Sequence, residues 1–365
     1  MKLRIQKEEI LPLLAAMASI ADRRPVQAIL SHVLLRCGDD DIQLLATDSE
    51  IQLSGHLPVA AVEAGETTIP ARKLYDICRT LADNSEIHLH KDGQRLTLRS
   101  GSARFTLPTL PAQDFPVMDQ PPAQLQGNCD GEDLQRALAV AATTMAHNDT
   151  RYYLNGVLME VGGQTMRLVA TDGHRLAKME IPFAHREDAD AYQGILPRKA
   201  VLELLRILAA GDTVCHFHTR GFVLEQGQQQ FACRLIDANY PDYRRVIPMG
   251  QPSRCQVNRQ SFRAALQQID VIASDKNPVC SVQFHPHEII LRSRNEEQEE
   301  GEVSVPANLT GSATEISFNA RYLLDVQQIV SEEELLLEIR DSSSSALIRG
   351  VESDNPLYIV MPIRL

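Results

Sequence analysis

The chain has 365 residues, 44% of them hydrophobic, which is enough apolar material for the cores of about two or three domains. Its seven cysteines are scattered without a C-x-x-C pair, which argues against disulfides and a zinc site, and no uncharged run approaches the roughly 18 residues of a membrane span. The formal net charge of −12 argues at first sight against nucleic acid as a partner.

Six segments carry apolar residues at intervals of three and four residues, which is the pattern of one face of an amphipathic helix. In the first segment this stripe runs from Ile10 to Met17. Asp130 and Asn258 stand at the starts of the third and fifth segments and are predicted N-caps, because their side-chain oxygens can accept backbone N–H groups. The predicted helices lie within residues 7–24, 71–82, 134–146, 198–210, 258–274 and 319–330.

A strand–turn–strand segment recurs between these helices. Leu168-Val-Ala-Thr-Asp-Gly-His-Arg-Leu176 predicts an apolar strand, a Thr-Asp-Gly turn and the start of a second strand. Leu44-Leu-Ala-Thr-Asp-Ser-Glu50 is nearly the same segment 124 residues earlier, and Ile290-Leu-Arg-Ser-Arg-Asn-Glu296 is a degraded third copy. Strands are also predicted before the three copies, at 30–36, 153–160 and 279–284. The recurrence predicts a fold built from three repeats.

Proline-containing segments mark the ends of the repeats. Asp114-Phe-Pro116 and Asn239-Tyr-Pro-Asp-Tyr243 end the first two thirds, and Gln120–Ala123 and Gly250–Ser253 are predicted linkers. We therefore predict domains over residues 1–121, 122–250 and 251–365. The fold class is α+β, with two helices per domain packed on antiparallel sheets.

The charge is unevenly distributed between the helices and the rest of the chain. The six predicted helical spans hold 13 basic and 7 acidic residues, whereas the remainder holds 23 basic and 41 acidic residues. Basic residues also occupy the first turns of three helices, where the helix dipole disfavours them: Arg72, Lys73, Arg198, Lys199 and Arg321. Any one of these is explained by solvated surface charge, but the recurrence favours an anion bound at these helices. Such binding would be directed to the phosphate backbone and would not read base sequence.

Three patterns admit a second interpretation. Asp172 and His174 could form an acid–base pair of an enzyme, but Asp48 holds the matching place in the first copy without a following histidine, which favours a turn residue. Three His-x-His pairs, at 88/90, 216/218 and 285/287, each share a strand face, but no third metal ligand is spaced nearby. The acidic run Glu296–Glu302 is a solvated loop or a partner for a basic strand on another subunit.

We predict no catalysis, no metal and no cofactor. The charged N-terminal segment lacks the apolar stretch of a signal peptide, so we expect a cytoplasmic protein.

Four motifs together resemble the β subunits of bacterial DNA polymerase III, the sliding clamps, along essentially the whole chain. These motifs are Arg151-Tyr-Tyr-Leu-Asn-Gly156, Ala170-Thr-Asp-Gly-His-Arg-Leu176, Tyr240-Pro-Asp-Tyr-Arg-Arg-Val246 and Val360-Met-Pro-Ile-Arg-Leu365. The resemblance implies the DNA clamp fold and a head-to-tail homodimer that forms a ring around double-stranded DNA, with helices lining the hole. It implies no catalytic activity. The implied partners are the DNA polymerase III core, the clamp loader, and other polymerases and repair proteins that carry a short clamp-binding peptide.

The resemblance also implies three groups of site residues by matching position. The partner-peptide pocket would comprise Leu154, Thr171, Gly173, His174, Arg175, Leu176, Pro241, Arg245, Val246, Ser345, Val360, Met361, Pro362 and Ile363. The duplex would contact Arg24, Arg72, His147, Tyr152, Tyr153, Arg198 and Lys199. The dimer interface would join Phe105 and Leu107 of one protomer to Val271 and Ile272 of the other. The chain departs from the family at Ile363, where methionine is frequent, and at Asn148, where glutamine is usual.

Overall fold

A computed structural model describes residues 1–22, 25–186, 190–273 and 278–364. These residues divide into two compact units. Unit 1 comprises residues 1–135, 183–190 and 199–235, and unit 2 comprises residues 136–182, 191–198 and 236–365. Each unit is described by itself.

Six α-helices occur in the described residues, each overlapping one predicted span, and the third begins and ends earlier than its predicted span of 134–146. They are α1 (Lys7–Ile20), α2 (Ala71–Thr80), α3 (Gly131–Ala142), α4 (Arg198–Ile207), α5 (Arg259–Ile272) and α6 (Ala320–Ile329). Both predicted N-caps are confirmed, because the Asn258 side chain accepts from the Ser261 N–H at 3.1 Å and the Asp130 carboxylate accepts from the Glu132 N–H at 2.8 Å. Over their observed lengths the helices hold 11 basic and 8 acidic residues, a smaller basic excess than predicted. None of them is long and apolar enough to span a membrane.

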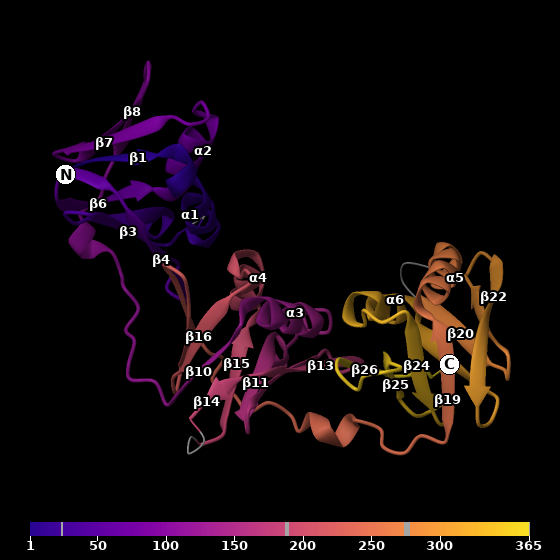
Figure 1. Ribbon diagram of the computed structural model, residues 1–365. Helices are drawn as coiled ribbons and strands as arrows, with labels where there is room; N and C mark the ends of the chain where they lie inside the picture. The colour runs from indigo at the N-terminus through magenta and orange to yellow at the C-terminus, as the bar shows by residue number, and fades with distance from the viewer. Residues whose placement is uncertain (23–24, 187–189, 274–277, 365) are drawn as a thin grey trace. The chain divides into compact units, whose positions relative to one another are not determined.

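Unit 1 contains a five-stranded sheet near the N-terminus. Its order is β5 (Ala60–Glu63), β1 (Lys2–Gln6), β7 (Glu86–Asp92), β8 (Arg95–Ser100) and β9 (Ala103–Pro108). Apolar and polar residues alternate along β1, so that Leu3 and Ile5 are buried while Lys2 and Arg4 are exposed. Helices α1 and α2 pack against each other beside this sheet (Figure 1). One face of the sheet therefore forms the core and the other faces solvent.

A nine-stranded sheet completes unit 1. Its order is β14 (Ala184–His185), β10 (Leu125–Asp130), β16 (Asp212–Phe217), β17 (Gly221–Gln226), β18 (Gln229–Arg234), β4 (Ile51–Pro58), β3 (Asp41–Thr47), β2 (His32–Cys37) and β6 (Gly65–Pro70). Strands β18 and β4 pair directly, with Phe231 opposite Leu53. This pairing makes one continuous sheet from the first and the central thirds of the chain.

Unit 2 is built on a 12-stranded sheet. Its order is β15 (Tyr192–Pro197), β11 (Gly156–Gly162), β12 (Thr165–Thr171), β13 (Arg175–Pro182), β26 (Leu357–Val360), β25 (Ala346–Gly350), β24 (Glu334–Ile339), β19 (Ser253–Asn258), β22 (Glu300–Thr310), β21 (Glu288–Arg294), β20 (Val279–Phe284) and β23 (Thr314–Asn319). Strands β13 and β26 pair with Leu176 opposite Ile359, and α5 packs on α6 (Figure 1). All strand pairings among the described residues are antiparallel, as predicted.

Two predicted strands begin later than expected. Residues Tyr152–Leu154 form a short 3-10 helix, η3, and β11 starts only at Gly156. The Asn155 side chain accepts from the Asp149 N–H at 3.0 Å and donates to the Asp149 carbonyl at 2.9 Å, which closes the preceding loop. Likewise, residues Ala28–Ser31 form a 3-10 turn before β2.

Candidate functional site

The turn between β12 and β13 is held by its own side chains. The Thr171 hydroxyl donates to the Arg175 carbonyl at 2.7 Å and accepts from the Gly173 N–H at 3.1 Å. The Asp172 carboxylate accepts from the N–H groups of His174 and Arg175 at 2.9 and 3.1 Å. Gly173 has φ +91°, a left-handed conformation that favours glycine. The sequence folds into this turn because each of these residue types satisfies one of its constraints.

The first copy of the segment forms the same turn in unit 1. The Thr47 hydroxyl donates to the Ile51 carbonyl at 2.7 Å, and the Asp48 carboxylate accepts from the N–H groups of Glu50 and Ile51 at 2.9 and 2.8 Å. Ser49 takes the place of Gly173, with φ +79°. The aspartate is thus a turn-forming residue in both copies.

No group of three potential metal ligands occurs in the part of the chain that the structure describes.

A cavity of about 210 Å³ opens beside the Thr171–Arg175 turn in unit 2. We call it the turn cavity. Four segments bring residues to it: η3, the turn itself, the linker that includes the 3-10 turn η4 (Tyr243–Val246), and the chain at the end of β26. Its lining residues are Arg151, Tyr153, Leu154, Thr171, Gly173, Arg175, Leu176, Pro241, Asp242, Tyr243, Val246, Ile359 and Met361. The floor is apolar and the rim carries arginine and aspartate, so the cavity suits a ligand with apolar side chains and a polar backbone.

Buried polar contacts fix the linker wall of the turn cavity. The Tyr243 hydroxyl donates to the Glu160 carboxylate at 2.7 Å, and the Arg244 guanidinium donates to the same oxygen at 2.8 Å. Burial and the neighbouring Glu160 raise the pKa of Tyr243 well above its usual range, so its hydroxyl remains a donor. The Tyr240 hydroxyl accepts from the Thr171 N–H at 3.1 Å, which ties the linker to the turn.

Arg175 joins the turn cavity to helix α6. Its guanidinium donates to Asp172 at 3.0 Å, forms a close ion pair with Asp325, and stacks on the Tyr322 ring with 4.3 Å to the ring centre. The Arg175 and Asp325 side chains are 17% and 23% exposed, so this ion pair is only weakly screened by solvent. Two residues of α6 therefore set the position of an arginine that lines the cavity.

Arg151 covers the turn from the other side. It pairs with Asp149 at 2.7 Å and donates to the Asp172 carbonyl at 3.0 Å. Hydrogen bonds from Arg151 hold the pKa of Asp149 at about 2. A Cβ atom placed on Gly173 would lie 2.9 Å from the Arg151 guanidinium, so the absence of a side chain at Gly173 lets the two segments meet.

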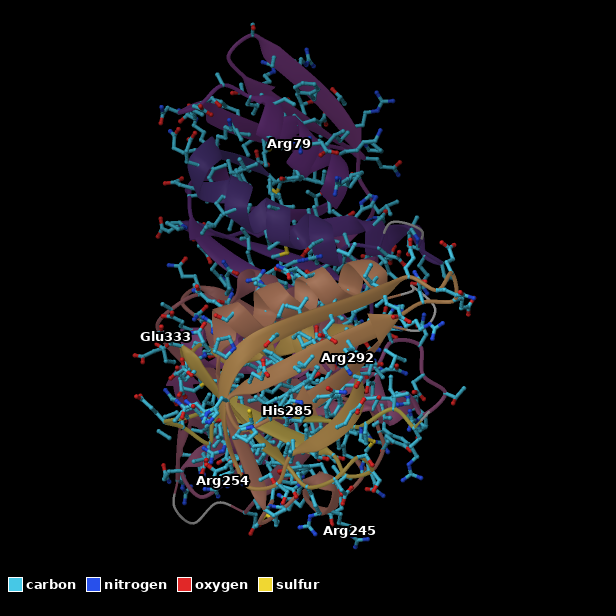
Figure 2. All side chains as sticks on the ribbon, turned by 90° about the vertical axis from the view of Figure 1, so that its right-hand side faces the viewer. Arg79, Arg245, Arg254, His285, Arg292 and Glu333 are labelled. Atoms are coloured by element: carbon cyan, nitrogen blue, oxygen red, sulfur yellow. The ribbon has the colours of Figure 1, made fainter. Side chains whose placement is uncertain are left out.

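Eight of the predicted pocket residues line the turn cavity: Leu154, Thr171, Gly173, Arg175, Leu176, Pro241, Val246 and Met361. Of the others, His174 is exposed, and its carbonyl accepts from the Met361 N–H at 2.8 Å. The Arg245 side chain is 84% exposed and extends away from the chain (Figure 2). Val360 is buried within the sheet opposite Arg175 and Ala346. Ser345, Pro362 and Ile363 are half-buried and do not line the cavity.

Five lining residues were not among the predicted pocket residues: Arg151, Tyr153, Asp242, Tyr243 and Ile359. Four of them lie in the motifs that carry the family resemblance, so those motifs could have identified these four as pocket residues. Ile359 could have been found from strand alternation, because Ile359 and Met361 share a side of the terminal segment while Val360 points to the other.

Four of the residues predicted to contact DNA lie close to one another in unit 2. His147 and Tyr152 are exposed, and the Tyr152 and Tyr153 rings meet edge to face at 5.9 Å. Arg198 starts α4 and turns toward the carbonyls of residues 145 and 146, at 3.4 Å from each. The Ala146 N–H donates to the Leu154 carbonyl at 3.1 Å, which brings this loop and η3 together.

The other predicted DNA contacts belong to unit 1. Arg72 lies in the first turn of α2 and pairs with Asp76 at 3.4 Å. Lys199 lies in the first turn of α4 and forms a close ion pair with Asp48, whose side chain is almost fully buried. Arg24 lies outside the described residues. Both cations therefore have acidic partners with which a phosphate would compete.

The predicted interface residues differ in exposure. In unit 1, Phe105 is half-buried, Leu107 is buried, and both lie on β9, an edge strand of the five-stranded sheet. In unit 2, Val271 is 81% exposed near the end of α5, whereas Ile272 is half-buried and packs toward Gly301.

Three consecutive stretches of the chain match family models for the three domains of one protein. Residues 1–119 match the DNA polymerase III beta subunit N-terminal domain, residues 128–242 its central domain and residues 244–364 its C-terminal domain. The beta sliding clamp of Pseudomonas putida KT2440 is 38% identical over 99% of both chains, and that of Escherichia coli K12 is 34% identical over the full length of both.

Solved structures agree with these relatives. The DNA polymerase III subunit beta of Pseudomonas aeruginosa superimposes with a TM-score of 0.96 at 38% identity, over the whole of both chains. A Caulobacter crescentus beta sliding clamp, with polyethylene glycol bound to its proposed beta-motif tethering region, gives a TM-score of 0.94 at 32% identity and covers 100% of this chain and 99% of that one. This chain thus has the three-domain DNA clamp fold and belongs to the β subunits of bacterial DNA polymerase III, the β sliding clamps, which are non-catalytic processivity factors.

Proposed function

We propose that two copies of this chain form a head-to-tail ring around double-stranded DNA, and that the turn cavity binds a short peptide of each protein that the ring tethers. The partners would be the DNA polymerase III core, the clamp loader, and other polymerases and repair proteins. The ring would act in the cytoplasm, without metal or cofactor, and without preference for DNA sequence. Retention would be topological, so weak phosphate contacts suffice and sliding stays easy.

The turn cavity is the observation that carries this proposal. Leu154, Leu176, Val246, Ile359 and Met361 give it an apolar floor from four segments of the chain. Burying one Leu or Phe side chain there contributes about 1.5–3 kcal/mol before the costs of association. Two such anchors together contribute about 3–6 kcal/mol, less than the roughly 8 kcal/mol of a micromolar Kd, so we expect weak binding, which suits partners that must exchange. In the Caulobacter relative, polyethylene glycol is bound to a region proposed to tether the beta motif, which supports a surface that accepts a ligand on this fold.

Two linker residues provide a matched test of the cavity. Val246 lines the cavity and is 40% exposed, whereas Met249, three residues further along the linker, is 81% exposed and does not line it. Val246→Asp is expected to weaken binding of a Gln-Leu-x-Leu-Phe peptide at least tenfold in isothermal titration, because the carboxylate enters an apolar site. Met249→Asp is expected to leave the affinity unchanged. Equal affinity for both variants and the original chain would refute the proposal, as would unchanged binding after deletion of residues 361–365.

The proposed duplex contacts are tested by salt dependence. Replacing Arg72, Arg198 and Lys199 by serine should reduce retention on primed circular DNA. Each lost phosphate contact should lower the log–log salt slope by about 0.9. The loss should be the same for different DNA sequences, since no base edge is read. An unchanged slope would contradict a duplex that faces these helices.

Ring closure is proposed to join two strand edges. Among the described residues, β9 pairs only with β8, and residues 300–306 of β22 pair only with β21. Each edge can therefore accept a strand of a second copy. Phe105→Ser with Val271→Asp should give monomers in sedimentation velocity at micromolar concentration, whereas Val351→Asp, at another exposed valine, should leave dimers. Leu107 is a poorer choice, because it is buried within its own sheet.

A further inference from the structure

A buried carboxylate outside the turn cavity contacts the linker wall from behind. Glu160 lies on β11, is 8% exposed and does not line the cavity. Its Oε2 atom accepts from the Tyr243 hydroxyl at 2.7 Å and from the Arg244 guanidinium at 2.8 Å, and its Oε1 atom accepts from the Gln193 amide at 3.2 Å. A buried carboxylate without donors would be strongly unfavourable, so these contacts fix one orientation of the side chain.

The 3-10 turn η4 is held only weakly by its own backbone. The Arg245 N–H donates to the Asp242 carbonyl at 3.3 Å, and the Ile247 N–H donates to the Arg244 carbonyl at 3.4 Å. Both lengths exceed the usual maximum of about 3.2 Å for such bonds, and 3-10 turns have poor hydrogen-bond geometry in general. The bonds from η4 to Glu160 are shorter, and their charged acceptor makes them roughly twice as strong as neutral ones. The position of η4 is therefore set more by Glu160 than by the turn itself.

A second buried tyrosine holds only the start of the linker. The Tyr240 hydroxyl accepts from the Thr171 N–H at 3.1 Å, three residues before Tyr243. Val246 follows Tyr243 by another three residues, lines the cavity and is 40% exposed. Because Val246 lies beyond both anchors along the chain, its place depends mainly on the nearer one, which is the contact with Glu160.

The first third of the chain has neither this anchor nor the turn. Arg36 of β2 holds the position that corresponds to Glu160, 124 residues earlier, and it pairs with Glu66 of the neighbouring strand at 3.5 Å. Residues 116–123, all of them described, form no helical turn. The buried carboxylate and η4 thus occur together, beside the turn cavity.

We propose that Glu160 is a positioning residue for the peptide that binds in the turn cavity. It holds η4 in the conformation that presents Val246 to the ligand, without touching the ligand itself. This role rests on the proposed function, in which the cavity binds a peptide. Affinity falls with the fraction of molecules in which the wall is in place, so a loosened wall weakens binding even when every lining residue is present.

The test compares two buried glutamates of the same sheet by isothermal titration with a Gln-Leu-Ser-Leu-Phe peptide. Glu160→Ala leaves the Tyr243 hydroxyl without its acceptor and should weaken binding about tenfold. Glu160→Gln keeps an oxygen that accepts from this hydroxyl, so most of the affinity should be retained. The matched control is Glu338→Ala, since Glu338 is 7% exposed and pairs with Arg254 and Arg349, which do not line the cavity. The control should lower the melting temperature, as Glu160→Ala does, but leave the affinity unchanged.

Amide hydrogen exchange of residues 242–247 is a readout that needs no peptide. Exchange there should be faster in Glu160→Ala than in the original chain or in Glu338→Ala. Tyr243→Phe removes a single hydroxyl and should weaken peptide binding about threefold. Combined with Glu160→Ala it should weaken binding no further, because both changes act through one contact. If Glu160→Ala does not fold, the affinity and exchange of Tyr243→Phe decide by the same comparison.

Each outcome decides the role of Glu160. Equal affinity of Glu160→Ala and the original chain would overturn it, as would unchanged exchange at residues 242–247. Losses from Glu160→Ala and Tyr243→Phe that multiply, or an equal loss in Glu338→Ala, would assign the effect to general stability and also overturn it. Absence of peptide binding by the original chain would refute the proposed peptide site, and this role with it; that failure is distinct because it appears without any substitution.

Discussion

Replacing Gly173 by alanine should both destabilise unit 2 and weaken peptide binding in the turn cavity. Gly173 has φ +91°, where a residue with a Cβ atom is about 1–2 kcal/mol less stable. The new Cβ would also lie 2.9 Å from the Arg151 guanidinium, which must move away from the turn. Arg151 is 46% exposed, so the displacement of its ion pair with Asp149 adds little to this loss.

The expected loss of stability is therefore about 2 kcal/mol. For a unit of this size, the melting temperature should fall by roughly 4–8 °C in differential scanning calorimetry. Because Arg151 also lines the cavity, peptide affinity measured by isothermal titration should fall about threefold to tenfold.

Ser49 provides the matched control, since it holds the same position of the same turn in unit 1, with φ +79°. Ser49→Gly removes backbone strain but adds chain entropy to the unfolded state, so the melting temperature should stay the same or rise slightly. Peptide affinity should not change. A Gly173→Ala variant that matches the original chain in both stability and affinity would refute the argument that this turn is rigid and that it sets the wall of the cavity.

Three further predictions concern the same framework. Asp325→Asn should weaken peptide binding about threefold to tenfold by isothermal titration, although Asp325 does not line the cavity, because Arg175 loses one of its two carboxylates. Arg151 holds the Asp149 pKa at about 2, so their pair is stabilising above the ordinary carboxyl pKa of 3.8 and is lost as pH falls through about 2. The difference in melting temperature between the original chain and Asp149→Asn should thus stay constant from neutral pH down to about 4, and a difference that shrinks at higher pH would contradict this. All seven cysteines are buried, and burial raises the thiol pKa to about 12 at Cys78, Cys255 and Cys280, so Ellman's reagent should react with seven thiols only after unfolding.

The helices and the repeated turn could be predicted because their signals are local. A helix with apolar residues at i, i+3 and i+4 is stabilised when that face packs against the core. The Thr-Asp-x turn is likewise specified within five residues, and its hydrogen bonds recur in both copies. The matching position of Asp48 was therefore sufficient to assign Asp172 to a turn and not to catalysis.

The composition of the turn cavity could be predicted only in part, because register and long-range partners are not local. A shift of one residue in a strand exchanges the two faces, and this is the difference between Val360, which is buried in the sheet, and Ile359, which lines the cavity. The carboxylate that holds Arg175 comes from Asp325, 150 residues further along the chain. No spacing in the sequence indicates such a pair.

The same two turns explain why the compact units differ from the repeats of the sequence. In unit 1 the first-copy turn is tied to α4 by the ion pair of Asp48 with Lys199, and in unit 2 the second-copy turn is tied to α6 by Arg175 with Asp325. At both places a sheet also continues from one third of the chain into the next, through β18 with β4 and β13 with β26. Each unit therefore joins facing parts of neighbouring thirds. Because the turn cavity lies where the second-copy turn meets β26 and the linker, a peptide bound there would contact parts of two neighbouring repeats at once, which a single repeat could not provide.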